Sequence, residues 1–182
     1  MTKSTDKIVE HYTKGGLLDR ILEKLDAMGV SVDALTPADL KPVDEFHIGG
    51  VAATDDVLDQ LEIGTDTQVL DIGSGIGGTA RHIVARHGAQ VIGLDLTPEF
   101  VDAAQRLTEL VGLNAAFQVG SALDMPFEDD QFDLATLIHV GMNLPDKPKL
   151  FTEAARVLRP RGAFAVYDVM LLCDEHPAFP LP

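Results

Sequence analysis

Glycines and carboxylates in the first half of the chain have the types and spacing of a cofactor site. Four glycines lie between residues 73 and 78, after an apolar run that ends at Ile72, and a helical pattern starts at Thr79. Because glycine has no Cβ, such a turn lets a ligand approach the backbone, and the helix start offers unpaired N–H groups. The stretch 68–78 therefore predicts a backbone cradle for a nucleotide-like cofactor.

Two carboxylates help to distinguish a dinucleotide from a cationic ligand. Gly73, Gly75 and Gly78 match the GxGxxG fingerprint of dinucleotide binding, in which Asp95 would bind a ribose hydroxyl. Asp71, however, lies inside the glycine motif, where a dinucleotide-binding strand is usually apolar. A negative charge there favours a cationic ligand. The alternative is that Asp71 only holds the turn through hydrogen bonds from nearby backbone N–H groups.

The elements that must position these residues alternate along the chain. Apolar runs predict strands, and apolar residues at helical spacing predict the helices that surround them. This alternation indicates an α/β fold with a Rossmann-like doubly wound sheet of about five parallel strands, helices on both faces, and ligands at the carboxyl ends of the strands. The expected strands are 68–72, 90–95, 115–119, 132–140 and 163–169, and the expected helices are 17–25, 36–40, 51–61, 79–84, 97–110 and 147–158.

The predicted domain organisation is one structural domain with three parts. Residues 1–64 form an N-terminal helical cap and lead-in, 65–170 the cofactor-binding core, and 171–182 a Pro-rich tail. Within the cap, Pro42 is expected to end the second helix. The following stretch, 44–50, mixes acids, an aromatic residue, a histidine and paired glycines, which suits a functional loop as well as a simple connection.

Composition and charge argue against several classes of function. The formal net charge of −15 over 182 residues repels phosphate backbones and anionic membranes, so neither nucleic acid nor membrane is an expected partner. The single cysteine, Cys173, cannot form an internal disulfide, and no signal segment or membrane-spanning apolar run is found, which predicts a cytoplasmic protein. No metal-ligand spacing occurs, so no metal is expected.

Five motifs follow one another at the predicted strand ends. They are LDIGSGIGG (70–78), GLDLTPEF (93–100), GSALDMPF (120–127), DxFD (130–133) and EAARVLRPRG (153–162). Together they resemble the class I S-adenosylmethionine-dependent methyltransferases, in particular their small-molecule branch. FHIGG (46–50) and HVGMN (139–143) further resemble sarcosine/dimethylglycine N-methyltransferases and quinone-ring or sterol C-methyltransferases.

The resemblance implies a cofactor, S-adenosylmethionine, with S-adenosylhomocysteine as product, and a set of residues that bind it. The glycine backbone would lie against the methionine part, Asp95 would accept both ribose hydroxyls, and Leu96 and Met125 would cover the adenine faces. The Ser121 hydroxyl or nearby backbone would reach the adenine edge, where many relatives have Asp. The implied cofactor-binding residues are Asp71, Gly73, Ser74, Gly75, Asp95, Leu96, Ser121, Ala122, Leu123 and His139.

Methyl transfer to a small-molecule N, O or C nucleophile is the activity that the resemblance implies. The reaction needs alignment and exclusion of water more than a dedicated acid–base pair. If the acceptor must lose a proton, His139 or His47 could take it, and the sequence does not choose between them. Tyr12 and the loop at Phe46 could close over the site, although simple packing is the alternative for Tyr12 and a non-catalytic role for His139.

The end of the chain departs from the pattern that the resemblance implies. Such methyltransferases generally add two antiparallel strands after the fifth, whereas three prolines follow residue 170 here. We therefore expect the fifth strand to be an apolar edge that the tail or a second subunit covers, with a homodimer as one outcome. Two other functions stay open: a truncated cofactor-binding module without independent activity, and a nucleotide-dependent oxidoreductase.

Overall fold

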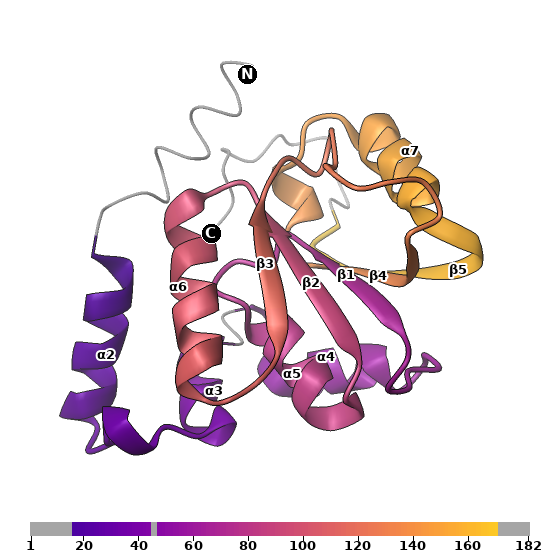
Figure 1. Ribbon diagram of the computed structural model, residues 1–182. Helices are drawn as coiled ribbons and strands as arrows, with labels where there is room; N and C mark the ends of the chain where they lie inside the picture. The colour runs from indigo at the N-terminus through magenta and orange to yellow at the C-terminus, as the bar shows by residue number, and fades with distance from the viewer. Residues whose placement is uncertain (1–15, 45–46, 171–182) are drawn as a thin grey trace.

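Strand β1 (Gln68–Ile72) lies at the centre of a parallel sheet, with β2 and β4 on either side (Figure 1). The computed structural model describes residues 16–44 and 47–170. The sheet has five strands in the order β3-β2-β1-β4-β5, and all neighbours run parallel. The other strands are β2 (Gln90–Asp95), β3 (Ala115–Val119), β4 (Phe132–Ile138) and β5 (Leu158–Tyr167). The predicted α/β fold with five parallel strands is confirmed.

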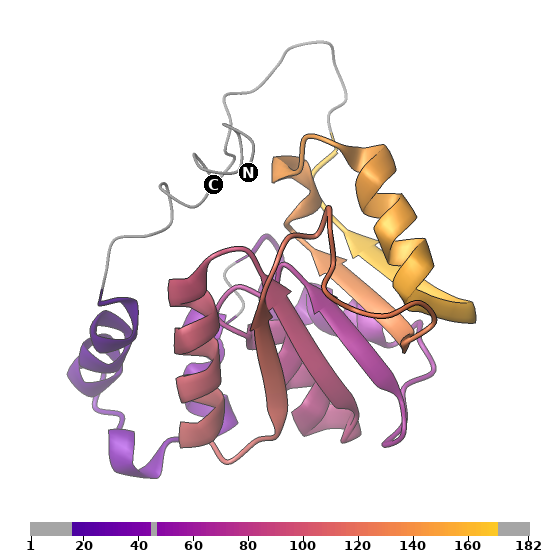
Figure 2. The same cartoon turned by 45° about the horizontal axis from the view of Figure 1, so that its top comes forward.

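Helices cover both faces of this sheet, as Figures 1 and 2 show. Short 3₁₀ turns, η1 (Val32–Ala34) and η2 (Gly141–Asn143), interrupt two of the connections. The helices are α2 (Leu17–Ala27), α3 (Pro37–Asp44), α4 (Gly50–Leu58), α5 (Gly78–His87), α6 (Pro98–Leu110) and α7 (Lys147–Val157).

The alternation of side chains along β1 divides the core into two layers. Val69 packs in a cluster with Leu58 of α4 and Ile83 of α5. Leu70 and Ile72 point to the other face, where they join a cluster that includes residues 150, 154 and 157 of α7. Successive residues of a strand face opposite sides of a sheet. A strand buried on both faces therefore needs the continuous apolar character that this one has.

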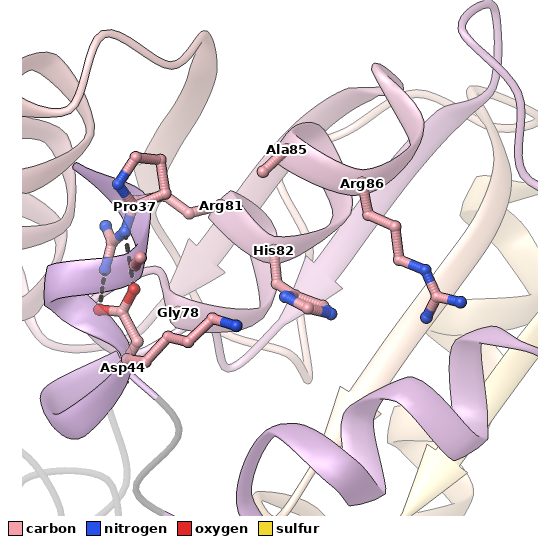
Figure 3. Close-up of a pocket in the computed structure, with 9 residues that line it drawn as sticks. Pro37, Asp44, Gly78, Arg81, His82, Ala85 and Arg86 are labelled. Carbon is pink, nitrogen blue, oxygen red and sulfur yellow. Dashed lines mark hydrogen bonds and ion pairs between the residues drawn. The ribbon is translucent and has the colours of Figure 1, made fainter.

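The N-terminal helices join the sheet through a third cluster and a buried ion pair. Leu25 of α2 and Leu40 of α3 pack with Leu107 of α6. The Arg81 guanidinium on α5 pairs with the Asp44 carboxylate at the end of α3, beside a cavity of about 220 Å³ (Figure 3). Arg81 also donates to the main-chain oxygen of residue 104 at 3.3 Å and to the hydroxyl of residue 108 at 3.1 Å. One buried side chain thus connects α3, α5 and α6.

Several predicted boundaries were wrong. Helix α3 continues through Pro42 to Asp44 instead of ending at the proline. A proline removes a single N–H from a helix, and the Arg81–Asp44 pair holds the last turn in place. Strand β5 starts at Leu158, so the stretch 159–162 that was expected to turn belongs to the strand. Residues 159–162 have no paired residue on β4, because the register shifts between Phe132 and Leu134, so Pro160 is tolerated at this irregularity.

Two histidines of α5, His82 and His87, are partly buried. The His82 side chain is 17% exposed, and its Nε2 lies 2.8 Å from Oδ1 of Asp55. Burial is the main cause of the lowered pKa of His87. Both side chains lie on the part of α5 that faces the rest of the protein.

Candidate functional site

The glycine turn after β1 is held by its neighbours on both sides. The amides of Gly73 and Ser74 donate to the main-chain oxygen of Leu94 on β2, at 2.7 and 3.0 Å. Gly73 has a φ of 75°, and a Cβ built on it would lie 2.5 Å from the methyl groups of Val140, which follows β4. Only glycine fits this position, because any side chain would meet both the left-handed backbone and Val140.

Gly75 is the open part of the turn. Its φ is 54°, and a Cβ built on it would have no heavy atom within 4 Å. The backbone here is therefore accessible, unlike that at Gly73. Its N–H donates to Oδ2 of Asp95 at 2.9 Å, so the turn is tied to the end of β2.

The Asp95 carboxylate is oriented by backbone donors from two turns. Oδ2 accepts from Gly75, and Oδ1 accepts from the amide of Thr97 at 2.8 Å. Burial raises the pKa of Asp95, while these amide hydrogen bonds act in the opposite direction. A carboxylate offers about four lone-pair positions. Donors from Gly75, Leu96 and Thr97 share this carboxylate, and a ligand hydroxyl would bind to the same two oxygens.

Asp71 is buried beneath the turn and contacts β4. Its side chain is only 2% exposed, and Oδ1 accepts from the hydroxyl of Thr136 at 2.9 Å. This contact with a side chain of the neighbouring strand differs from the backbone contacts considered for it in the sequence. Asp71 therefore places its charge under the turn and links β1 to β4.

Ser74 points in the same inward direction. A Cβ built on Gly93 would lie 2.7 Å from its Oγ, so the hydroxyl packs over the backbone of β2. This Oγ is buried and has no hydrogen-bond partner within the described ranges. Leu96, in contrast, is partly exposed directly after Asp95.

The turn after β3 is fixed by its own side chain. Ser121 Oγ accepts from the Leu123 amide at 3.1 Å, and the Ser121 carbonyl accepts from the Asp124 amide at 3.0 Å. Ala122 between them is partly buried against the α7 side of the core. The Leu123 amide is therefore engaged within the turn, while the hydroxyl proton of Ser121 points away from that bond.

An ion pair on α7 holds the continuation of this turn. The amide of Met125 donates to Oε2 of Glu153 at 2.8 Å, and Arg156 donates to the same oxygen at 2.8 Å. Arg156 also donates to the carbonyls of Met125 and Phe127, at 3.0 and 2.7 Å. Hydrogen bonds and charge from Arg156 lower the pKa of Glu153 to about 2. The sequence analysis missed this role, although both residues lie within the EAAR part of a quoted motif.

His139 follows β4 at the same edge of the sheet. It has a φ of 58°, a conformation that is uncommon for residues other than glycine and is often found at functional sites. Its amide donates to the carbonyl of Tyr167 at 2.7 Å. Its ring atom Nε2 is buried and finds no hydrogen-bond partner among the residues that the structure describes.

His47 lies beside His139, with 6.3 Å between the ring centroids. Its Nδ1 is 3.1 Å from the carbonyl of Ile48, and its Nε2 is 3.1 Å from the hydroxyl of Thr54. Because a carbonyl only accepts, Nδ1 carries a proton, and Nε2 is paired with the Thr54 hydroxyl. The structure thus brings together the two histidines that the sequence left as alternatives, and it gives them different surroundings.

Two groups expected near the site lie outside the described residues, namely Tyr12 and Phe46. The sequence analysis, in turn, missed Tyr167, which ends β5 at 6.1 Å from the His47 ring. The signal for it was weak, since a tyrosine late in an apolar strand is usual in a core. Within the described ranges, no group of three or more His, Cys, Asp or Glu residues could hold a metal ion. No helix in those ranges has the length and apolar character to cross a membrane.

These features agree with a nucleoside cofactor that carries polar and charged groups. Gly75 leaves the backbone open, and the Asp95 carboxylate is oriented beside it at the end of β2. His139 adds a buried ring nitrogen, and such an atom costs free energy until a bound group pairs with it. All three lie after parallel strands at one edge of the sheet, where ligands of open α/β folds bind.

Comparison with known proteins gives a family and several relatives. A family profile described as a methyltransferase domain matches residues 70–166, more than half of the chain. Tocopherol O-methyltransferase of Arabidopsis thaliana is 39% identical over 60% of this chain and 32% of its own length. Ajmaline N-methyltransferase of Rauvolfia serpentina is 34% identical over 86% of this chain and 55% of its own.

A solved structure shows the same architecture with a cofactor. Phosphoethanolamine N-methyltransferase 2 of Haemonchus contortus, in complex with S-adenosyl-L-methionine, matches with a TM-score of 0.64 and 28% identity. The match covers 68% of this chain and 29% of that one. The chain thus spans about a third to a half of the length of these relatives.

Proposed function

The chain belongs to the methyltransferase domain family, and we propose that it transfers the methyl group of S-adenosylmethionine to an N, O or C nucleophile of a small molecule. The observation that carries this proposal is the Asp95 carboxylate. The amides of Gly75 and Thr97 orient it at the end of β2, beside the open glycine turn. A pair of ribose hydroxyls has the donors that such a carboxylate accepts.

We assign the cofactor-binding roles along the edge of the sheet. The backbone at Gly73 and Gly75 would lie against the methionine part, and Ser74 would act through its main chain because its hydroxyl faces β2. Asp71 would place a negative charge beneath the positively charged sulfur at short range. Leu96 and Met125 would cover the adenine faces.

At the adenine edge, the Ser121 hydroxyl is a better candidate than the Leu123 amide, because that amide is already bonded within the turn. The Ser121 hydroxyl accepts from that amide and keeps its proton, so we expect it to donate to a ring nitrogen of adenine. The backbone of Ala122 would lie beside it. This arrangement differs from that of relatives with Asp at this position, since a hydroxyl provides no negative charge for the adenine amino group.

His139 is our candidate for the base when the acceptor must lose a proton. When bound, S-adenosylmethionine supplies an electrophilic methyl group, which is displaced in line by the nucleophile. The proton of the acceptor would go to Nε2 of His139, a buried nitrogen that no described group occupies. Nε2 of His47, in contrast, already pairs with Thr54. The alternative role of His139 is cofactor binding: with a proton on Nε2 the ring would donate to the methionine carboxylate, and it would then not act as the base.

A second candidate function is a cofactor-binding module without independent activity. The observation that favours it is length, because the chain spans only about a third to a half of the relatives that it matches. Acceptor-binding residues of these folds are carried by loops and additional segments that vary between proteins. The cofactor half of the proposed site, which consists of the glycine turn 73–78, Asp95 and the turn at Ser121, is the same in both cases.

Calorimetry and a turnover screen test these two functions. We expect S-adenosylmethionine and S-adenosylhomocysteine to bind the full chain and NAD not to bind. Amines, phenols and quinols are then offered as acceptors, with Asp95→Asn as the matched control for cofactor-dependent transfer. Binding without methylation of any acceptor supports the module. Binding of NAD alone would overturn both candidates in favour of an oxidoreductase.

We also propose that a second copy of the chain covers the β5 edge. An unpaired edge strand is a template for association, and Phe151 and Val166 beside it are 51% and 39% exposed. Light scattering over a range of protein concentrations tests this, and Phe151→Glu should weaken the dimer. A monomer at every concentration would contradict it. The cytoplasmic location expected from the sequence stays a prediction.

A further inference from the structure

Tyr167 is in contact with both candidate histidines, and we propose that it is a positioning residue that sets the spacing between His47 and His139. The inference rests on the proposed function, because it concerns the acceptor half of the proposed site, which consists of His47, His139 and Tyr167. Tyr167 ends β5 beside the end of β4, and Figure 2 shows these two strands next to each other. From this place it makes one contact with its main chain and another with its side chain.

The main-chain contact holds His139. The Tyr167 carbonyl accepts from the His139 amide at 2.7 Å, directly after the last paired residues of β4 and β5. His139 then adopts its left-handed backbone, and Val140 packs against Gly73. This bond fixes the point at which the chain leaves β4.

The side-chain contact holds the loop that carries His47. The Tyr167 hydroxyl donates to the Ile48 carbonyl at 3.2 Å, across 119 residues of sequence. The same carbonyl accepts from Nδ1 of His47 at 3.1 Å. One carbonyl oxygen has two lone pairs, so it can serve both donors. Tyr167 and His47 are therefore coupled through a shared acceptor.

Packing around the loop leaves little freedom for a different arrangement. The Tyr167 ring meets the His47 ring edge-on, with 6.1 Å between centroids and 64° between planes. A Cβ built on Gly49 would lie 3.3 Å from the Tyr167 hydroxyl and 2.6 Å from Cβ of Ala53. The loop thus sits between Tyr167 and α4 at close approach, which requires glycine at residue 49.

The result is a defined pair of imidazoles, 6.3 Å apart, with different protonation roles. The shared carbonyl accepts from Nδ1 of His47 and so orients this ring. His139 is left with the ring nitrogen that can exchange a proton. Tyr167 acts through these residues, and its hydroxyl is directed at the Ile48 carbonyl.

The Tyr167→Phe variant tests the proposal, because it removes only the hydroxyl and keeps both the ring and the main-chain contact. The matched control is Val166→Ala, the neighbouring residue of β5, whose side chain lies on the opposite face and is 39% exposed. Long-range ¹H–¹⁵N spectra of the imidazole rings in the full chain report the tautomer of each histidine. We expect Tyr167→Phe to change the His47 signals and raise the share of its Nε2–H tautomer, and Val166→Ala to leave them unchanged.

Calorimetry with S-adenosylhomocysteine separates this inference from the proposed function. We expect its Kd for Tyr167→Phe to stay within about threefold of the unmodified chain, since the hydroxyl contacts the acceptor half alone. With a methylated acceptor from the screen, KM should rise about five- to tenfold, the effect of one lost hydrogen bond, with a smaller change in kcat.

Unchanged His47 signals in Tyr167→Phe would overturn the proposal, whether or not the cofactor binds. Failure of S-adenosylhomocysteine to bind the unmodified chain would instead overturn the proposed function and leave the spectroscopic result standing. Equal changes in Tyr167→Phe and Val166→Ala would show a general loosening of β5, which also contradicts a specific positioning role.

Discussion

The two halves of the carboxyl edge of the sheet are built in different ways. In the cofactor half, many contacts are short-range: Asp95 and Ser121 each accept from the amide two residues ahead, although the Gly75 amide also joins Asp95 across 20 residues. In the acceptor half, His47, His139 and Tyr167 come from three separate segments, and the contact from Tyr167 to the His47 loop spans 119 residues. The cofactor half is thus built mainly from turns at strand ends, whereas the acceptor half depends on contacts between distant segments.

This difference indicates where a methyltransferase of this kind can change its substrate. A local turn keeps its geometry as long as its own residues are kept, so the cofactor half tolerates changes elsewhere. The acceptor half depends on how loops from distant segments meet. Small changes in one of these loops therefore alter the acceptor half while the cofactor stays bound.

The largest effect should come from Asp95→Ala, which removes the central carboxylate of the cofactor half. Two charge-assisted hydrogen bonds to ribose hydroxyls would be lost, so we expect the Kd of S-adenosylhomocysteine to rise roughly 10³-fold. Calorimetry measures this directly. His47→Ala is the matched change in the acceptor half, and it should leave the Kd within about threefold. A comparable loss in both variants would show that the halves are not separable.

A smaller effect is expected at the point where the halves touch. Gly73→Ala places a methyl group 2.5 Å from Val140 on a backbone with φ of 75°, so we expect a loss of about 3 kcal/mol in the free energy of unfolding. Gly75→Ala has a φ of 54° but open space around it, and should cost about 1 kcal/mol.

Urea unfolding of the two glycine variants distinguishes crowding from backbone strain. Adding Val140→Ala to Gly73→Ala should restore part of the lost stability, because it removes the methyl groups that the new Cβ meets. The same addition to Gly75→Ala should restore nothing. Equal losses for Gly73→Ala and Gly75→Ala would mean that the halves do not meet at Gly73 and Val140.

The smallest effect concerns the ion pair that supports the adenine side. The pKa of Glu153 is lowered from 4.5 to about 2 in the folded chain. The carboxylate therefore stabilises the fold above about pH 4.5, and this stability is lost as the pH falls towards 2. The shift corresponds to about 3 kcal/mol, and solvent screening at the partly exposed Arg156 reduces it to about 2 kcal/mol.

Unfolding of the Glu153→Gln variant between pH 7 and 2 measures the stability that the Glu153 carboxylate contributes. We expect it to be less stable than the unmodified chain at pH 7, with the difference shrinking as the pH falls through 4.5 towards 2. Asp129→Asn is the control, since the Asp129 side chain is 74% exposed and its pair with Arg156 should contribute little. A constant difference at all pH values would show that Glu153 acts through packing alone.

The sequence by itself determined the sheet, together with the glycine turn and the acidic strand end at its carboxyl edge. Strand periodicity, the glycine turn and the acidic strand ends are local patterns, and local hydrogen bonds reproduce them in the structure, as Asp95 with Gly75 and Thr97 shows. The family motifs added the identity of the cofactor. Both kinds of signal depend on residues that are close together in the chain or at fixed strand ends.

Only the tertiary structure decided where α3 ends and β5 begins, and how the two histidines and Tyr167 are arranged. Helix α3 passes Pro42 because Arg81 holds Asp44 from another helix, and β5 extends across Pro160 because its register with β4 shifts there. The different surroundings of His47 and His139, and the part of Tyr167 between them, depend on how distant segments pack. Short-range propensities carry no information on such contacts, since their free energy is gained only when the whole chain has folded.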